Sequence, residues 1–315
     1  MNIFVNPNDN RVRAGWRLLL QFVLFLLLVF SLMIAKNVLI TESMKIYDSL
    51  TMGIAGIISI WVAAKLWDWR NIKDYGLAWS KKWAKELTLG LILGFLAMGL
   101  IFFIEWSAGW IEVVGFGWER SSVVPYPFWI LSYLISMIII GFYEELIFRG
   151  YQIINMVEGF YSSSINLVKA SALAILISSI IFGLLHAGNA NATLVSTLNI
   201  MMAGIMLAVP FLLTGRLAIS IGIHISWNFI QGGLFGFAVS GMPFRGSIIQ
   251  IKQKGTAYIT GGSFGPEAGL LGLFGILFIL ALVILYIRKQ NESISIDPSF
   301  KKVLPKSVKQ DERRP

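Results

Sequence analysis

The chain alternates long apolar segments with shorter polar ones. Eight apolar segments approach or reach the roughly 20 residues that an α-helix needs to cross a bilayer. They predict membrane-spanning helices near residues 17–36, 50–67, 87–105, 127–150, 169–188, 193–214, 217–239 and 268–287. The fourth helix can continue to about Val157. The pattern therefore predicts an all-α fold, a polytopic membrane helical bundle of about eight transmembrane helices.

The polar segments divide the chain around this bundle. Residues 1–16 are predicted to form a cytoplasmic N-terminus, residues 17–288 the transmembrane bundle, and residues 289–315 a disordered cytoplasmic tail rich in Lys and Ser. Within the bundle, about 127–240 holds the candidate site described below. Residues 240–267 form the longest outer loop, in which 247–253 and 256–260 are expected to pair as a short hairpin.

Composition agrees with a membrane protein. The chain has 315 residues, of which 56% are hydrophobic and 14% charged, whereas soluble domains carry about 25% charged residues. There is no cysteine, which excludes disulfides, thiolate nucleophiles and Cys-ligated zinc. The net charge of +9 does not indicate nucleic-acid binding, because the cations lie in the flanks and loops of the apolar segments.

The placement of Lys and Arg predicts the orientation of the chain. With the N-terminus inside, all but six of the 26 Lys and Arg residues fall in inner segments. The six outer ones are Lys36, Lys45, Arg120, Arg245, Lys252 and Lys254. Both termini are therefore expected to be cytoplasmic, in a multi-pass integral membrane protein.

Two adjacent carboxylates lie in or near the fourth span. Ionisable groups inside apolar spans cost about 2.5–3.5 kcal/mol each on insertion scales, so each needs an explanation. Glu145 and Arg149 are four residues apart and share a helical face, so they can pair. Glu144 points about 100° away and can face a different cavity. The alternative is that both glutamates lie at the membrane surface and cap a helix end.

The two histidines of the chain both lie in apolar spans. His186 follows Phe182 by four residues, and His224 precedes Asn228 by four, so that His224 and Asn228 share one helical face. A carboxylate with two imidazoles and an amide can activate water and stabilise an oxyanion. Glu144, His186 and His224 are also a ligand set that suits zinc. The lack of an HExxH helix favours metal-free chemistry, and the sequence leaves both routes open.

These motifs, in this order, resemble the CPBP family. It comprises the CAAX prenyl endopeptidases of the second type and the bacterial Abi or bacteriocin-processing proteins. The resemblance rests on Glu144-Glu145-x-x-x-Arg149, Phe182-x-x-x-His186 and His224-x-x-x-Asn228, and covers about 130–240. It implies that Glu144 and His186 activate the attacking water and that His224 and Asn228 hold the oxyanion. Glu145 and Arg149 would support the site.

The expected function is hydrolysis of a peptide bond in a membrane-associated, prenylated or leader peptide, in a bacterial cell membrane. Its partners are the peptide substrate and the bilayer. A proton-coupled transporter and a catalytically idle immunity or scaffolding protein of the same fold are the alternatives. One conflict of depth remains: Glu144 is predicted towards the inner side, whereas His186 ends an outward-running span. Either the fourth helix is long and tilted, or the fifth span has other boundaries.

Overall fold

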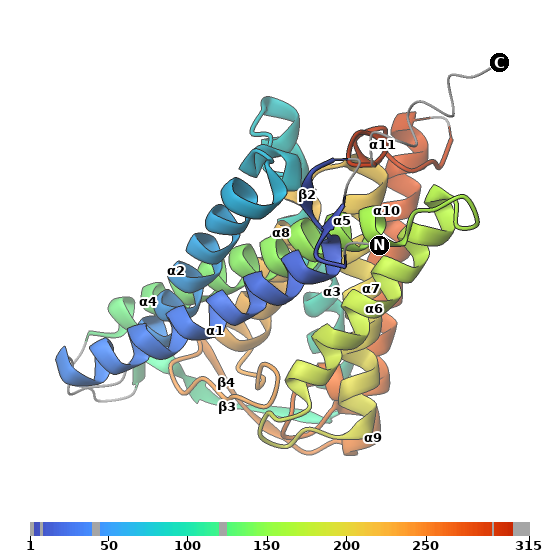
Figure 1. The fold of residues 1–315 in the computed structure, drawn as a ribbon. Helices are drawn as coiled ribbons and strands as arrows, with labels where there is room; N and C mark the ends of the chain where they lie inside the picture. The colour runs from blue at the N-terminus through green and yellow to red at the C-terminus, as the bar shows by residue number, and fades with distance from the viewer. Residues whose placement is uncertain (1–2, 7–8, 40–44, 120–124, 292, 305–315) are drawn as a thin grey trace.

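The computed structural model describes residues 3–6, 9–39, 45–119, 125–291 and 293–304. Within these ranges seven helical runs are long and apolar enough to cross a membrane, so the fold is the predicted polytopic helical bundle (Figure 1). They contain α1 (Ala14–Leu39), α2 (Lys45–Ala63), α3 (Lys81–Ser107), α4 (Tyr126–Glu144), α6 (Leu167–His186), α7 (Leu194–Thr214) and α10 (Leu270–Asn291). Each overlaps a predicted span.

The fourth span is one helical run of 35 residues, Tyr126–Phe160. After α4 it continues as the π-helix η4 (Glu145–Ile153) and then as α5 (Ile154–Phe160). At about 1.5 Å per residue it is about 50 Å long, against a hydrocarbon core of about 30 Å. Glu144 ends the 19-residue α4 and therefore lies near the middle of the run. A long fourth helix thus resolves the conflict of depth between the candidate residues.

The segment expected as the seventh span, 217–239, forms a shorter helix enclosed by the others. It consists of α8 (Ala218–Asn228) and the π-helix η5 (Phe229–Leu234), and it is not among the seven long runs. It runs parallel to α3, because Ser226 donates to the Leu91 carbonyl at 2.6 Å and the rings of Phe102 and Phe235 stack 4.2 Å apart. The segment formed by α8 and η5 therefore runs beside α3 through most of the length of the bundle.

Glycines bring α8 close to its neighbours. A Cβ at Gly90 of α3 would lie 2.3 Å from the carbonyl oxygen of Ile219. A Cβ at Gly141 of α4 would lie 2.7 Å from Cγ1 of Ile225. Neither distance is compatible with a side chain, so small residues permit these close contacts. They bring α4 within reach of His224 on α8.

A buried cluster of charges closes the end of the bundle where the described chain begins. Arg17 of α1 lies 3.1 Å from Asp68 and 2.9 Å from Glu158. Arg70 lies 2.6 Å from Glu158, which also pairs with Arg11. We call these five residues the terminal charge cluster. It joins the N-terminal hairpin of β1 (Val5–Asn6) and β2 (Arg11–Val12) to α1, to the π-turn η1 (Ala64–Asp68) and to α5.

Part of the polar tail packs on the same end of the bundle, which differs from the expectation of a disordered segment. The short helix α11 (Ser299–Lys302) buries Phe300, whose ring lies 5.3 Å from that of Phe211. The Asp297 N–H donates to the carbonyl of Leu212 at 3.0 Å. The predicted tail beyond residue 304 lies outside the described residues.

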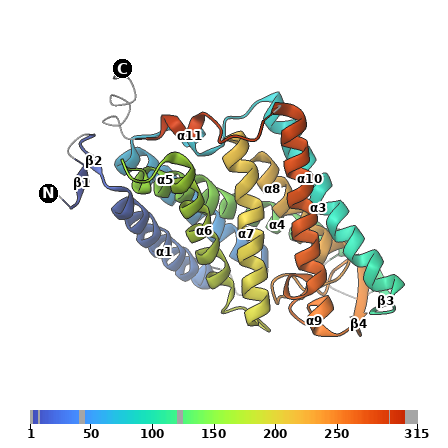
Figure 2. The same ribbon diagram turned by 90° about the vertical axis from the view of Figure 1, so that its right-hand side faces the viewer.

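The opposite end of the bundle carries the long loop between η5 and α10. The expected hairpin in this loop is wrong: β4 (Ile249–Gln253) pairs with β3 (Ile111–Phe116), and α9 (Ala257–Thr260) is helical. The loop ends with the 3-10 turn η6 (Pro266–Ala268). Figures 1 and 2 show β4 and α9 at one end of the molecule and β2 and α11 at the other.

Two further turns complete the described elements. The 3-10 turns η2 (Ile72–Tyr75) and η3 (Gly117–Glu119) lie in the connections before α3 and after β3.

Candidate active site

Glu144 and Glu145 lie where α4 changes into the π-helix η4. Single π-turns inside α-helices occur frequently at functional sites. The Glu145 side chain is fully buried, whereas that of Glu144 is 14% exposed. The two neighbours therefore face different surroundings, as the helical period predicts, and neither merely caps a helix end at the membrane surface.

Glu145 connects α4 to α8. Its Oε1 accepts from His224 Nδ1 at 2.8 Å and from Arg149 Nη1 at 3.1 Å. The predicted pair of Glu145 and Arg149 is thus present, and it is buried from solvent. The guanidinium also lies over the Phe182 ring, 4.2 Å from its centre. Since a carboxylate only accepts, His224 Nδ1 carries a proton, and Nε2 faces Glu144 with 3.8 Å between Nε2 and Oε2.

His186 ends α6 and is held by the preceding turn of its own helix. Its Nδ1 lies 2.7 Å from the carbonyl oxygen of Phe182. A carbonyl only accepts, so Nδ1 donates, and Nε2 of the neutral ring is left as an acceptor. The Phe182 ring lies 4.7 Å from the His186 ring and 6.3 Å from that of His224. One aromatic side chain thus separates and orients both imidazoles.

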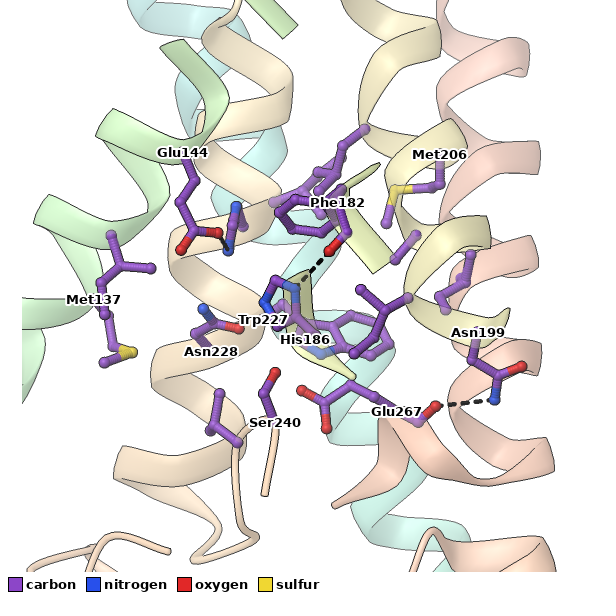
Figure 3. Close-up of a pocket in the computed structure, with 18 of the residues that line it drawn as sticks. Met137, Glu144, Phe182, His186, Asn199, Met206, Trp227, Asn228, Ser240 and Glu267 are labelled. Carbon is purple, nitrogen blue, oxygen red and sulfur yellow. Dashed lines mark hydrogen bonds and ion pairs between the residues drawn. The ribbon is translucent and has the colours of Figure 1, made fainter. Parts of the chain in front are cut away.

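Four of the candidate residues line a single cavity of about 190 Å³. They are Glu144, His186, His224 and Asn228, and they come from α4, α6 and α8 (Figure 3). The other two, Glu145 and Arg149, do not line the cavity but lie behind its wall. The structure therefore brings the six predicted residues together. Four of them surround the cavity, and the buried pair of Glu145 and Arg149 contacts one of these four, His224.

The cavity extends from Glu144 towards the end of the bundle that carries β4 and α9. There it is lined by polar residues that the sequence reasoning missed: Asn189, Asn199, Ser240 and Glu267. Glu267 had a signal in the sequence, since it is the only acidic residue between Glu158 and Glu292. Figure 3 shows Glu144 and Glu267 on opposite sides of His186. The cavity therefore has a carboxyl group towards each end.

The geometry bears on the metal ligands that the sequence offers, Glu144, His186 and His224. Among the described residues, no group of three His, Asp or Glu side chains is arranged to hold a metal ion. Glu144, His186 and His224 share the cavity, but they do not form such a group, and His224 Nδ1 is used by Glu145. The residues as they lie do not fit a resident zinc ion.

The fold and the cavity define a class: a multi-pass membrane protein with a carboxylate and two imidazoles around a cavity within its helices. Residues 126–230 match the family model described as type II CAAX prenyl endopeptidase Rce1-like. The match covers one third of the chain, from the start of α4 into η5, and contains all six predicted site residues. In this segment the chain is therefore similar to the Rce1-like family of CAAX-type endopeptidases, which confirms the predicted resemblance. A search of curated proteins found no match.

Proposed function

We propose that the protein is an intramembrane endopeptidase that hydrolyses a peptide bond of a membrane-associated, prenylated or leader peptide. The observation that carries this proposal is the convergence of Glu144, His186, His224 and Asn228 on one cavity. Glu144 is reachable from the cavity, whereas the adjacent Glu145 is balanced by Arg149 behind it. The match to the Rce1-like family supports the same reaction class.

In the proposed reaction Glu144 accepts a proton from a water molecule that His186 Nε2 helps to orient. The water oxygen bonds to the scissile carbonyl carbon, and the π electrons of the carbonyl move to its oxygen. Asn228 Nδ2 donates to this oxyanion. His224 donates through Nε2 only as the doubly protonated ring, because its Nδ1–H is used by Glu145. When the carbonyl re-forms, the C–N bond breaks and the proton on Glu144 passes to the leaving amine.

We also propose the side from which substrate enters. The Lys and Arg distribution predicts cytoplasmic termini, and the cavity extends towards the end of the bundle opposite to them. On the other side of Glu144, all residues from Glu145 to Glu158 except Gln152 are buried. A substrate segment would therefore reach Glu144 from the non-cytoplasmic half of the membrane.

The test uses the purified full chain in liposomes with a fluorogenic membrane-anchored peptide library. Glu144→Gln and His186→Ala are expected to lower turnover by about 10²–10⁴-fold each. Glu105→Gln serves as the control. Glu105 is a buried carboxyl group on α3 that does not line the cavity. Unchanged turnover in both site variants would falsify the proposal. Proton-coupled solute flux without cleavage would instead favour a transporter.

The side of entry is tested separately with membrane-impermeant peptides. Liposomes are sorted by the protease accessibility of a tag fused to the C-terminus. Cleavage is expected only for vesicles whose tag lies on the side opposite to the added peptide. Cleavage restricted to the tag side contradicts this part of the proposal and leaves the reaction itself untouched.

A further inference from the structure

Glu267 is a buried carboxyl group at the opposite end of the cavity from Glu144, in a loop outside the family match. It lies in η6, immediately before α10, and is 6% exposed. Its backbone carbonyl accepts from Asn199 Nδ2 at 2.9 Å, which fixes the turn to α7. The proposed hydrolysis assigns no role to this side chain.

Neutral donors hold the Glu267 carboxylate in place. Gln231 Nε2 donates to its Oε2 at 2.6 Å, and the Trp227 side chain and the Ser240 backbone also donate to it. Gln231 is itself fully buried, and its Nε2 donates a second hydrogen bond to the carbonyl oxygen of Ala238 at 2.6 Å. These contacts hold the carboxylate in one position at the cavity wall.

Among the described residues, no positive charge compensates Glu267. In the part of the chain that the structure describes, neither Lys nor Arg forms an ion pair with it or contributes to its electrostatic environment. The other buried acidic side chains near the site and at the terminal end, Glu145, Asp68 and Glu158, are each paired with arginine. An uncompensated carboxylate at a cavity wall is complementary to a cation that enters the cavity.

We propose that Glu267 is a specificity-determining residue that binds a positively charged group of the substrate peptide, an ammonium or guanidinium group, while the scissile bond lies at Glu144. This inference rests on the proposed endopeptidase function and adds the chemical class of the substrate. The charge is supplied by a Lys or Arg side chain or by a free α-amino group. Charge-assisted hydrogen bonds of this kind are strong in a site that excludes water.

Burial raises the pKa of Glu267 to about 7, and the hydrogen bond from Gln231 opposes this shift. The free carboxyl is therefore largely protonated below that pH and ionised above it. The titratable groups that face it are Tyr133 of α4, whose phenol interacts electrostatically with the carboxylate, and His186 across the cavity. Preference for a cationic peptide is expected to increase as the pH rises through about 7.

The experiment compares pairs of peptides that differ at one position, where one peptide has Lys and the other norleucine. Each pair tests a different position of the peptide. A second pair compares a free with an acetylated N-terminus, which separates the two sources of charge. The measured quantity is the ratio of kcat/KM within each pair. In the wild-type chain one pair is expected to show a ratio of about tenfold or more.

Glu267→Gln keeps the acceptor for Gln231 and removes the charge, so the ratio is expected to fall towards one. Glu105→Gln is the matched control, since Glu105 is also fully buried and accepts from a glutamine amide, Gln253 Nε2, at 2.8 Å outside the cavity. It is expected to leave the ratio unchanged. An equal ratio in wild type and Glu267→Gln overturns the proposal.

Two further measurements keep the outcomes distinguishable. If Glu267→Gln does not fold, the wild-type ratio measured between pH 6 and 8 decides: a ratio of one throughout overturns the inference. Binding of the same pairs, followed by fluorescence anisotropy, does not require turnover. Tighter binding of the cationic peptides without cleavage supports the role of Glu267 and contradicts the endopeptidase function, whereas cleavage without preference does the reverse.

Discussion

His224 Nδ1 lies 2.8 Å from Glu145 Oε1, and the same oxygen holds Arg149 at 3.1 Å. One buried carboxylate oxygen thus fixes an imidazole of the cavity and balances a buried guanidinium. Glu144, one residue earlier, faces the cavity itself. The adjacent glutamates are therefore expected to respond differently to the same substitution.

Glu144→Gln is expected to lower turnover by about 10²–10⁴-fold and to leave the melting temperature nearly unchanged, because the Glu144 side chain, 14% exposed, is not part of an ion pair with arginine. Glu145→Gln is expected to destabilise the fold by about 3–5 kcal/mol, because it leaves Arg149 buried without a counter-charge. Thermal unfolding and peptide hydrolysis, measured on the same preparations, check both. Equal stability losses in the two variants would contradict the assignment of separate roles.

The pair of Glu145 and Arg149 makes a second prediction. Replacing both by apolar residues of similar length, Glu145→Met with Arg149→Met, is expected to cost less stability than either single change, since no charge is then left unpaired. A double-mutant cycle on the free energy of unfolding measures this coupling. Additive effects would show that the two side chains do not stabilise each other.

The sequence predicted most of the bundle and six residues that meet at or behind the cavity wall, because apolar length and the rarity of charges within apolar spans are local signals. It did not predict the depth of Glu144, which depends on the continuation of α4 through η4 and α5. The partner of β4 was missed because β3 lies more than a hundred residues earlier in the chain. Glu267 was missed because its contacts with Asn199 and Gln231 exist only after α7, η5 and the last loop have packed.

Gly141 controls the spacing between α4 and α8. A Cβ there would lie 2.7 Å from Ile225 Cγ1 and 3.1 Å from the Ile225 backbone nitrogen, so Gly141→Ala must push the helices apart. The expected result is a loss of about 1–3 kcal/mol in stability and at least about tenfold in kcat/KM, since Glu145 moves away from His224. Gly99→Ala in α3 is the control, because nothing lies within 4 Å of its added Cβ. A wild-type kcat/KM in Gly141→Ala would refute this account.

The terminal charge cluster is expected to contribute far more to stability than a surface ion pair. Asp68→Asn removes the buried partner of Arg17, at a cost of about 3–5 kcal/mol. Glu112→Gln breaks the pair with Lys254, in which both side chains are 50% exposed, and it is expected to leave the melting temperature nearly unchanged because exposed ion pairs contribute little. Denaturant or thermal unfolding in the same detergent compares the two. The prediction fails if the surface variant is the less stable one.

The enclosed position of α8 has a consequence for how the protein matures. Its residues from Ala218 to Trp227 are all buried, and its hydroxyl groups find their acceptors on other helices, Ser220 on Leu207 and Ser226 on Leu91. Alone in lipid this segment would leave those groups and His224 unsatisfied. It therefore settles only after its neighbours have assembled around it. Since His224 and Asn228, two of the four candidate residues that line the cavity, arrive with α8, the cavity is complete only once this segment has packed.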